Sequence, residues 1–309
     1  MTRTREDGKE EVFSACIKHD DTRYLGGDKN SSIPAGILQG RPRTGINYDK
    51  ANEFCANRGD WITMIDYLEY CAIQALCYIE YANFDNQAAL NTNLTSDGFK
   101  QGGLGAGVTN LVLDRWTAFN GNNPIVQTYW TAEHNIGNGS TNGDHYELGN
   151  YNTDGSNLST YPAVYRGILN FFGDIWTFIR DVVIINKDTN YNSVYLLKKG
   201  VNYADVTVDN INEKCYFIGD QANTDGFITE FDFRFGPYFV PNKVGTNKKA
   251  DYNSKRGSDG QDTDKAVCVL LLGGRADHGS AAGPDSFYSS WVWSGSGAYV
   301  GFFTTVKLD

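Results

Sequence analysis

Side chains able to make charged, polar and aromatic contacts gather in one stretch close to the C-terminus, between residues 273 and 301. Ser, Gly and Ala separate its larger side chains. Antibody binding loops have a similar composition, because aromatic rings supply contact area while Ser and Gly adapt to the ligand. The chemistry expected of this stretch is therefore ligand binding, by the residues Arg275, Asp277, His278, Ser280, Asp285, Ser286, Tyr288, Ser290, Trp291, Trp293 and Tyr299.

Two apolar runs enclose this stretch. Residues 267–272 precede it and residues 300–306 follow it, and each run predicts a buried strand. Between them we expect an exposed connection on rigid supports. An idiosyncratic surface loop without function is the alternative. The binding interpretation is favoured because exposed Trp and Tyr side chains are costly to leave without a purpose.

Catalytic signatures are weak elsewhere in the chain. Gly295-Ser296-Gly297 lacks the apolar strand that precedes a nucleophile elbow. The glycine-rich residues 102–107 have no strand–helix–strand unit around them and predict a turn. Nothing in the spacing positions a catalytic triad around the four histidines, His19, His134, His145 and His278. We therefore expect a protein that is not an enzyme and that needs no cofactor.

Metal binding is not expected either. The six cysteines lack the CxxC spacing of zinc sites, and buried thiols are favoured over disulfides for Cys16, Cys55, Cys71, Cys77, Cys215 and Cys268. Residues 150–157 and 220–225 are rich in Asp and Asn, so oxygen ligands for calcium are available there. They lack the ordered spacing of a calcium loop, and solvated loops are the preferred interpretation.

The chain is acidic, with a net charge of −10 and a pI of about 4.9. Nucleic acid and anionic membranes bind basic surfaces, so neither is expected as a partner. No apolar run approaches the roughly 20 residues of a membrane-spanning helix, and membrane insertion is not expected. The polar N-terminus shows no signal peptide. The 309 residues suffice for one large core.

The clearest helix is predicted after Trp61. Thr63 with Asp66 three residues later resembles a capping box, with an acidic residue in the third position. Apolar residues on both flanks predict a largely buried helix, and the helical spacing is carried by Ile65, Leu68, Ala72, Ala75, Leu76 and Ile79.

The remaining chain predicts one α+β domain with long loop insertions. Residues 1–30 read as an N-terminal arm or edge element and residues 31–309 as the domain. Strands are expected at residues 175–185, 194–197 and 216–218, and short ones at 108–113 and 125–131 within a loop-rich region. Residues 243–265 are charged and Gly/Asp-rich, which favours a mobile loop.

Residues 165–178 read YRGILNFFGDIWTF, and residues 273–301 open with Gly-Gly and close with Val-Gly. The first segment is similar to the N-x-x-G-N-V-W-E-W motif of the formylglycine-generating-enzyme branch of the C-type-lectin-like fold. The second resembles the G-G-x-W-x-x-G-x-x-A-G … V-G-x-R ending of variable proteins of diversity-generating retroelements. Trp61 and its helix fit the same family's first helix. The framework positions of the ending fall on Gly279, Ala282, Gly283, Val300 and Gly301.

This resemblance implies a C-type-lectin-like fold whose C-terminal face is diversified. In such proteins the adenines of template Asn codons are mutagenised. Trp291 and Trp293 are not reachable in that way and would be fixed anchors or come from another template codon. Trp176 is expected to fill the core beneath the face. The reachable residue types are Arg275, Asp277, His278, Ser286, Tyr288, Ser290 and Tyr299.

The function that the resemblance implies is receptor binding, for host attachment at a phage tail. The partner would be a protein or glycan receptor on a host or target cell, and the protein would lie on the virion or a bacterial cell surface. A homotrimer or attachment to other virion proteins is considered as its assembly. One alternative is a non-diversified structural component of the same fold. A formylglycine-generating-type oxidase is less favoured, because that activity relies on a cysteine pair near the C-terminus and Cys268 is the last cysteine.

Overall fold

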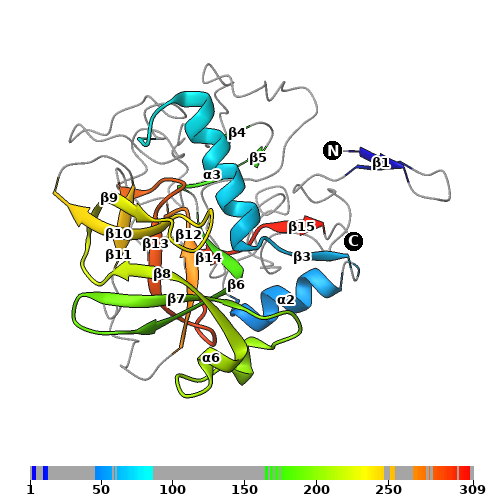
Figure 1. Ribbon diagram of the computed structural model, residues 1–309. Helices are drawn as coiled ribbons and strands as arrows, with labels where there is room; N and C mark the ends of the chain where they lie inside the picture. Colours follow the sequence, from blue (N-terminus) through cyan, green and yellow to red (C-terminus); the bar gives the residue numbers. More distant parts are fainter. Residues whose placement is uncertain are drawn as a thin grey trace, which may run out of the picture.

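The structure is a computed structural model that describes residues 2–4, 10–12, 46–57, 59, 61–85, 164–165, 168–169, 171–173, 175–246, 251–254, 267–275, 278, 281–297 and 299–306. Within these residues the protein is a mixed α/β structure, mostly sheet with few helices (Figure 1). The expected combination of helices with a sheet is confirmed at this level.

One nine-stranded sheet dominates the described chain, in the order β10-β9-β11-β13-β12-β6-β7-β8, with β14 paired to β6. Its ladders are antiparallel except for β11–β13 and β14–β6. The strands are β6 (Trp176–Asn186), β7 (Tyr191–Leu197), β8 (Cys215–Ala222), β9 (Gly226–Asp232), β10 (Val240–Gly245), β11 (Tyr252–Ser254), β12 (Cys268–Leu272), β13 (Phe287–Val292) and β14 (Val300–Gly301).

Three smaller strand pairs are also described: β1 (Thr2–Thr4) with β2 (Glu10–Val12), β3 (Ile62–Met64) with β15 (Thr304–Val306), and β4 (Val164–Tyr165) with β5 (Ile168–Leu169). The helical segments are α2 (Tyr48–Ala56), α3 (Tyr67–Tyr81), the 3-10 turn η2 (Tyr203–Asp205) and α6 (Ile211–Lys214).

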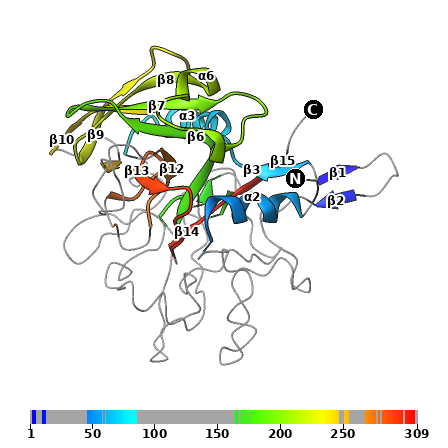
Figure 2. The same ribbon diagram turned by 90° about the horizontal axis from the view of Figure 1, so that it is seen from below.

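The centre of the sheet is buried on both faces. In β12, Leu270 and Leu272 belong to the core cluster that contains residues of α3, whereas Val269 and Leu271 belong to the cluster that contains residues of α2. Successive strand residues point to opposite faces, so a strand covered on both sides must be apolar throughout. Figures 1 and 2 show α2 and α3 beside different parts of β6. The unbroken apolar run in the sequence follows from this position.

Helix α3 begins one turn later than the sequence suggests. Asp66 is its N-cap: the Asp66 side chain accepts from Glu69 N, and the Glu69 side chain accepts from Asp66 N. These reciprocal bonds form a capping box. The predicted role of Thr63 in capping is wrong, because Thr63 lies in β3 and pairs with Thr305.

The predicted buried side of α3 is also wrong in part. Leu68, Leu76 and Ile79 are exposed by 49%, 51% and 78%. The inward side carries Tyr67 and Gln74 instead, because their polar groups find partners: the Tyr67 hydroxyl donates to Phe239 O at 2.9 Å, and Gln74 donates to Pro284 O at 3.0 Å. Hydropathy alone could not reveal those partners.

The two edge strands of the sheet, β8 and β10, lie close together. Asn242 Nδ2 of β10 donates to Asp220 O of β8 at 3.0 Å, and Asp220 N donates to Asp232 Oδ2 at 3.2 Å. Gly219 permits this approach, since an added Cβ would lie 3.2–3.3 Å from Asp232 and Val240. We call this region, where β8 meets the ends of β9 and β10, the seam (Figure 1).

Most strand predictions within the described chain are confirmed. Strands β6, β7, β8 and β12 cover the predicted segments, and residues 300–306 divide into β14 and β15. The loop predicted for 243–265 is wrong at its start and at Tyr252–Ser254, which form the end of β10 and β11. The strands predicted at 108–113 and 125–131, and all but six residues of the N-terminal arm, lie outside the described residues.

The cysteine prediction is confirmed where the structure describes it. Cys55, Cys71, Cys77, Cys215 and Cys268 are buried thiols, and Cys16 lies outside the described residues. Burial raises the pKa of the Cys215 thiol to about 11. These residues therefore act as small apolar side chains, and all of them except Cys268 belong to one of the two core clusters.

Candidate ligand-binding face and a second polar hollow

The C-terminal stretch is not a single exposed connection. Strand β13 runs through its middle and pairs with β12 on one side and β11 on the other. The prediction that residues 275–299 form an exposed loop is therefore wrong for β13. The Ser and Trp residues of this strand do not predict a buried strand, yet the strand lies inside the sheet.

Four of the candidate binding residues are buried, and the prediction of their exposure is wrong. Ser286 and Ser290 are 0% exposed, Asp285 is 1% exposed and Trp291 is 2% exposed. Trp291 belongs to the core cluster on the α2 side and donates from Nε1 to Gly295 O at 3.2 Å. A buried indole usually finds such a partner.

The other described candidates are partly exposed and lie over the same core cluster: Arg275, His278, Tyr288, Trp293 and Tyr299. We call this set the aromatic face. Asp277 and Ser280 lie outside the described residues. The face stands on the ends of β12, β13 and β14, and the residues that follow β12 and precede β14 complete it.

Trp176, 3% exposed, forms the floor of the aromatic face as the sequence predicts. The Tyr288 ring stacks on the Trp176 ring with 5.4 Å between centroids, and the His278 ring meets Trp176 edge-on at 5.3 Å. Tyr299 packs edge-on against Trp291 at 5.9 Å, and the Arg275 guanidinium lies 4.3 Å from the Tyr299 ring centroid. The rings form one continuous contact that holds each outer side chain in place.

The His278 imidazole is neutral at neutral pH. Burial, and to a smaller extent the positive charge of Arg275, lowers its pKa from 6.5 to about 3. Both causes disfavour the protonated form. The face therefore offers one fixed positive charge at Arg275 together with neutral rings and a neutral imidazole.

Three glycines, Gly273, Gly274 and Gly283, hold the backbone beneath the face. Gly273 and Gly274 have φ values of +96° and +75°, which L side chains rarely adopt. A Cβ on Gly274 would lie 2.7 Å from the Ala282 Cα, and one on Gly283 would lie 2.1 Å from the Asp251 carboxylate. Another framework glycine of the resemblance, Gly279, lies outside the described residues.

Asp285 ties the segment beneath the face to α3. Its Oδ1 accepts from Gln74 Nε2 at 2.8 Å, its Oδ2 accepts from the Tyr78 hydroxyl, and its backbone N donates to Asp251 Oδ2 at 2.8 Å. Burial raises the pKa of the Asp285 carboxyl well above its usual range. Asp285 is thus a structural link between helix and sheet, although its type suggested an exposed contact.

The sequence interpretation missed a second polar region, at the seam. A hollow of about 700 Å³ opens there, and we call it the seam hollow. Asp220 and Gln221 were expected in a solvated loop, but they lie in β8 and are 7% and 0% exposed. Its lining residues are Tyr191, Asp220, Glu230, Phe231, Asp232, Phe233, Arg234 and Asn242.

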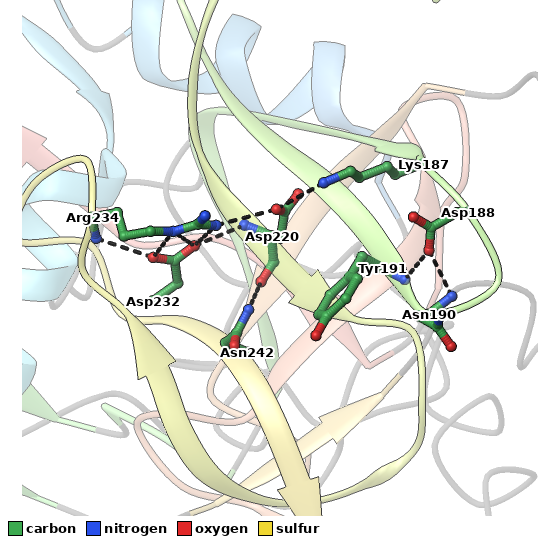
Figure 3. Close-up of polar contacts among 8 residues, drawn as sticks. All are labelled: Lys187, Asp188, Asn190, Tyr191, Asp220, Asp232, Arg234 and Asn242. Atoms are coloured by element: carbon green, nitrogen blue, oxygen red, sulfur yellow. Dashed lines mark hydrogen bonds and ion pairs between the residues drawn. The ribbon is translucent and has the colours of Figure 1, made fainter.

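Figure 3 shows the polar contacts around this hollow. Arg234 Nε lies 2.9 and 3.0 Å from the two carboxylate oxygens of Asp232, and its Nη2 lies 2.6 Å from Oδ2. Asp220 Oδ2 accepts from Arg234 Nη2 at 3.2 Å and from Lys187 Nζ at 2.9 Å. The hydrogen bond from Arg234 lowers the pKa of Asp232 below its usual value. One sequence signal could have pointed here: Asp220 closely follows the apolar residues 216–218, and Asp232 directly follows Phe231 at the end of β9.

No protein-family model matches the chain, and no curated protein matches it significantly. Among the described residues no group of three or more His, Cys, Asp or Glu side chains is arranged to hold a metal ion. None of the described helices is long and apolar enough to cross a membrane.

Proposed function

We propose that this chain is a diversified ligand-binding protein of C-type-lectin-like fold, and that the aromatic face is its binding surface. The observation that carries the proposal is the layered build of that face. Outer rings at Tyr288 and Tyr299 rest on the buried indoles of Trp176 and Trp291. Such an arrangement allows the outer side chains to change while the floor stays fixed.

Several features support this role. The mixed fold puts rigid strands on either side of the face, and the glycine framework at Gly273, Gly274 and Gly283 matches the ending that the sequence resembles. Aromatic rings and Arg dominate the energetics of protein interfaces. A standard interface buries about 800 Å² per partner, which requires the face and its immediate surroundings.

The structure also divides the positions that mutagenesis of Asn codons could diversify. Arg275, His278, Tyr288 and Tyr299 lie on the face, whereas Ser286 and Ser290 are buried. The Ser286 hydroxyl donates to Ala281 O at 2.5 Å, so a larger residue there would disturb the support. We therefore expect sequence diversity at the four positions on the face and small residues at the buried positions 286 and 290.

The proposed setting is a phage tail or a bacterial cell surface, with a protein or glycan receptor on the target cell as the ligand. A homotrimer or attachment to other virion proteins would raise the avidity of such a face. The function is recognition, and the proposal assigns no catalytic step to the chain.

Sequencing the DNA beside the gene tests diversification. We expect a reverse-transcriptase gene and a template repeat of the 3′ end, with adenines of Asn codons opposite the codons for Arg275, His278, Tyr288 and Tyr299. The Trp291 codon should be free of them. Absence of both gene and repeat would favour the non-diversified structural component.

A displayed library tests binding directly. Positions 275, 278, 288 and 299 are randomised, and selection is made against a purified protein target such as hen lysozyme. We expect folded binders from this library and few from a control library at positions 79, 208, 216 and 235, which are more exposed. Equal yields from both libraries would contradict the assignment of the face.

A further inference from the structure

The seam hollow carries polar atoms that the fold leaves without partners. The Oδ1 atom of Asp220 is buried and has no hydrogen-bond partner in the described part of the chain. Since the fold normally satisfies buried polar atoms, an oxygen of this kind calls for a donor from another molecule. Asp220 is 7% exposed and lines the hollow.

Other groups around the hollow also keep unused capacity. Arg234 engages Asp232 and Asp220 through Nε and Nη2, so the two N–H groups on Nη1 remain available. Asn242 donates from Nδ2, which leaves its Oδ1 to accept. The Tyr191 hydroxyl can do both. Donors and acceptors therefore alternate around one opening.

Charge around the hollow is already balanced. Asp220 pairs with Lys187 and Arg234, Asp232 pairs with Arg234, and Glu230 pairs with Lys243 at 2.5 Å. An anion would be repelled by three carboxylates, and a cation would compete with the Lys and Arg side chains that already pair with these carboxylates. A neutral ligand faces neither penalty.

Aromatic side chains supply the apolar part of the lining. Phe233 is 50% exposed, and the centroid of its ring lies 6.0 Å from that of Phe231 and 5.1 Å from that of Phe239. The Phe231 and Phe239 rings thus support the Phe233 ring, and half of the Phe233 surface remains exposed. A ligand that suits this lining has an apolar face for the ring and several hydroxyl groups for the polar atoms.

We infer that the seam hollow is a binding site for a neutral saccharide, separate from the aromatic face. Sugar hydroxyls both donate and accept, so they match the unused groups of Asp220, Arg234, Asn242 and Tyr191. The C–H face of the ring would lie on Phe233. The Arg234–Asp232 contact fixes the guanidinium before the ligand arrives, which lowers the entropy lost on binding.

Saturation-transfer NMR on the full chain tests this site with glucose, galactose, mannose and N-acetylglucosamine. Sugar concentrations up to about 20 mM detect dissociation constants in the millimolar range. We expect transfer to at least one of these sugars. Glucosamine, which is cationic, should bind more weakly than N-acetylglucosamine. No transfer to any neutral sugar would overturn the inference, and so would tighter binding of glucosamine.

Two matched pairs of variants locate the sugar. Phe233→Ala should weaken binding on the order of ten-fold, as the loss of an aromatic contact does, whereas Tyr216→Ala should not change it. Tyr216 is an aromatic residue that is 61% exposed and absent from the lining, whereas Phe235 contacts the Arg234 guanidinium and is not a suitable control. Tyr191→Phe removes only a hydroxyl and should weaken binding, whereas Tyr216→Phe should leave it intact.

Thermal unfolding of each variant separates loss of binding from loss of fold. The expected result is a melting temperature close to that of the parent for Tyr191→Phe, together with weaker sugar binding. Equal sugar binding by the parent, Phe233→Ala and Tyr191→Phe would overturn the site. Sugar binding lost in Tyr299→Ala but kept in Phe233→Ala would place the sugar on the aromatic face and also overturn it.

Discussion

The aromatic face and the seam hollow differ in how their side chains are held. Rings of the face are stacked on buried indoles, and each outer ring contacts a floor that is complete without it. Polar groups of the hollow hold one another: Arg234 fixes Asp232 and contacts Asp220, which also binds Lys187. The first surface can exchange its outer residues singly. The second loses several contacts when one member is removed, because a buried partner is left unsatisfied.

The largest effect should separate the floor of the face from its outer layer. Trp291→Ala should lower the free energy of unfolding by about 3–5 kcal/mol, since it empties a buried volume. Tyr288→Ala should cost only about 1 kcal/mol because the ring is partly exposed. Urea unfolding monitored by circular dichroism measures both. Similar losses for the two variants would show that the face has no separate outer layer.

The backbone beneath the face should be less tolerant than the backbone at the C-terminal end of β10. Gly283→Ala places a Cβ 2.1 Å from the Asp251 carboxylate and should cost about 1–3 kcal/mol through overpacking. Gly245→Ala in β10 meets only the Thr229 methyl at 3.2 Å and should cost less than about 1 kcal/mol. Thermal melts of the two single variants give the comparison. A Gly245 variant less stable than the Gly283 variant would reverse it.

The face should carry a pH dependence of its own. The folded-state pKa of His278 is about 3 and its ordinary value is 6.5, so the unfolded chain binds the proton more readily. The stability that His278 contributes is present above about pH 6.5 and is lost as the pH falls toward 3. His278→Phe keeps a ring beside Trp176 and cannot titrate. Urea midpoints at several pH values between 7.5 and 4.5 should fall more steeply for the parent. Parallel slopes would contradict an imidazole that stays neutral in the folded chain.

The smallest effect is expected at the rim of the seam. Lys243 and Glu230 form an exposed pair, and exposed pairs contribute little to stability. Lys243→Gln should leave the melting temperature unchanged within error. Arg234→Gln should lower it, because Asp232 and Asp220 then lose a partner while they stay buried. Equal melting temperatures for the two variants would show that the hollow is not a cooperative network.

The sequence predicts much of the sheet and only part of the candidate sites. Residues 267–272 are apolar because β12 is covered on both faces, and that pattern is local. Ser289 and Ser290 gave no such signal. Both are 0% exposed although they point to opposite faces, so both faces of β13 are covered, and its neighbour β11 belongs to a segment whose composition favoured a loop. Burial by segments that are distant in the sequence cannot be predicted from the types of the buried residues.

The same reasoning explains why the seam was missed. Asp220 looked like a solvated loop residue because its partners, Lys187 and Arg234, lie 33 and 14 residues away in the sequence. Trp176, by contrast, was placed correctly beneath the face, since a large ring within an apolar strand fits a core position wherever the strand lies. The large volume of the Trp176 side chain predicted its position beneath the face, whereas no local pattern predicted which basic side chains would pair with Asp220.

The pairing of β3 with β15 has a consequence for biosynthesis. Thr305 Oγ1 donates to Glu69 Oε1 at 3.1 Å across 236 residues of sequence, and β12, β13 and β14 also join the sheet from the end of the chain. Contacts between distant segments form slowly. Until residues 268–301 have left the ribosome, β6 lacks β12 and β14, two of its strand neighbours, and presents open edges. Folding of this sheet must therefore wait for the synthesis of these residues, and the growing chain passes through an interval in which shielding by a chaperone would limit aggregation.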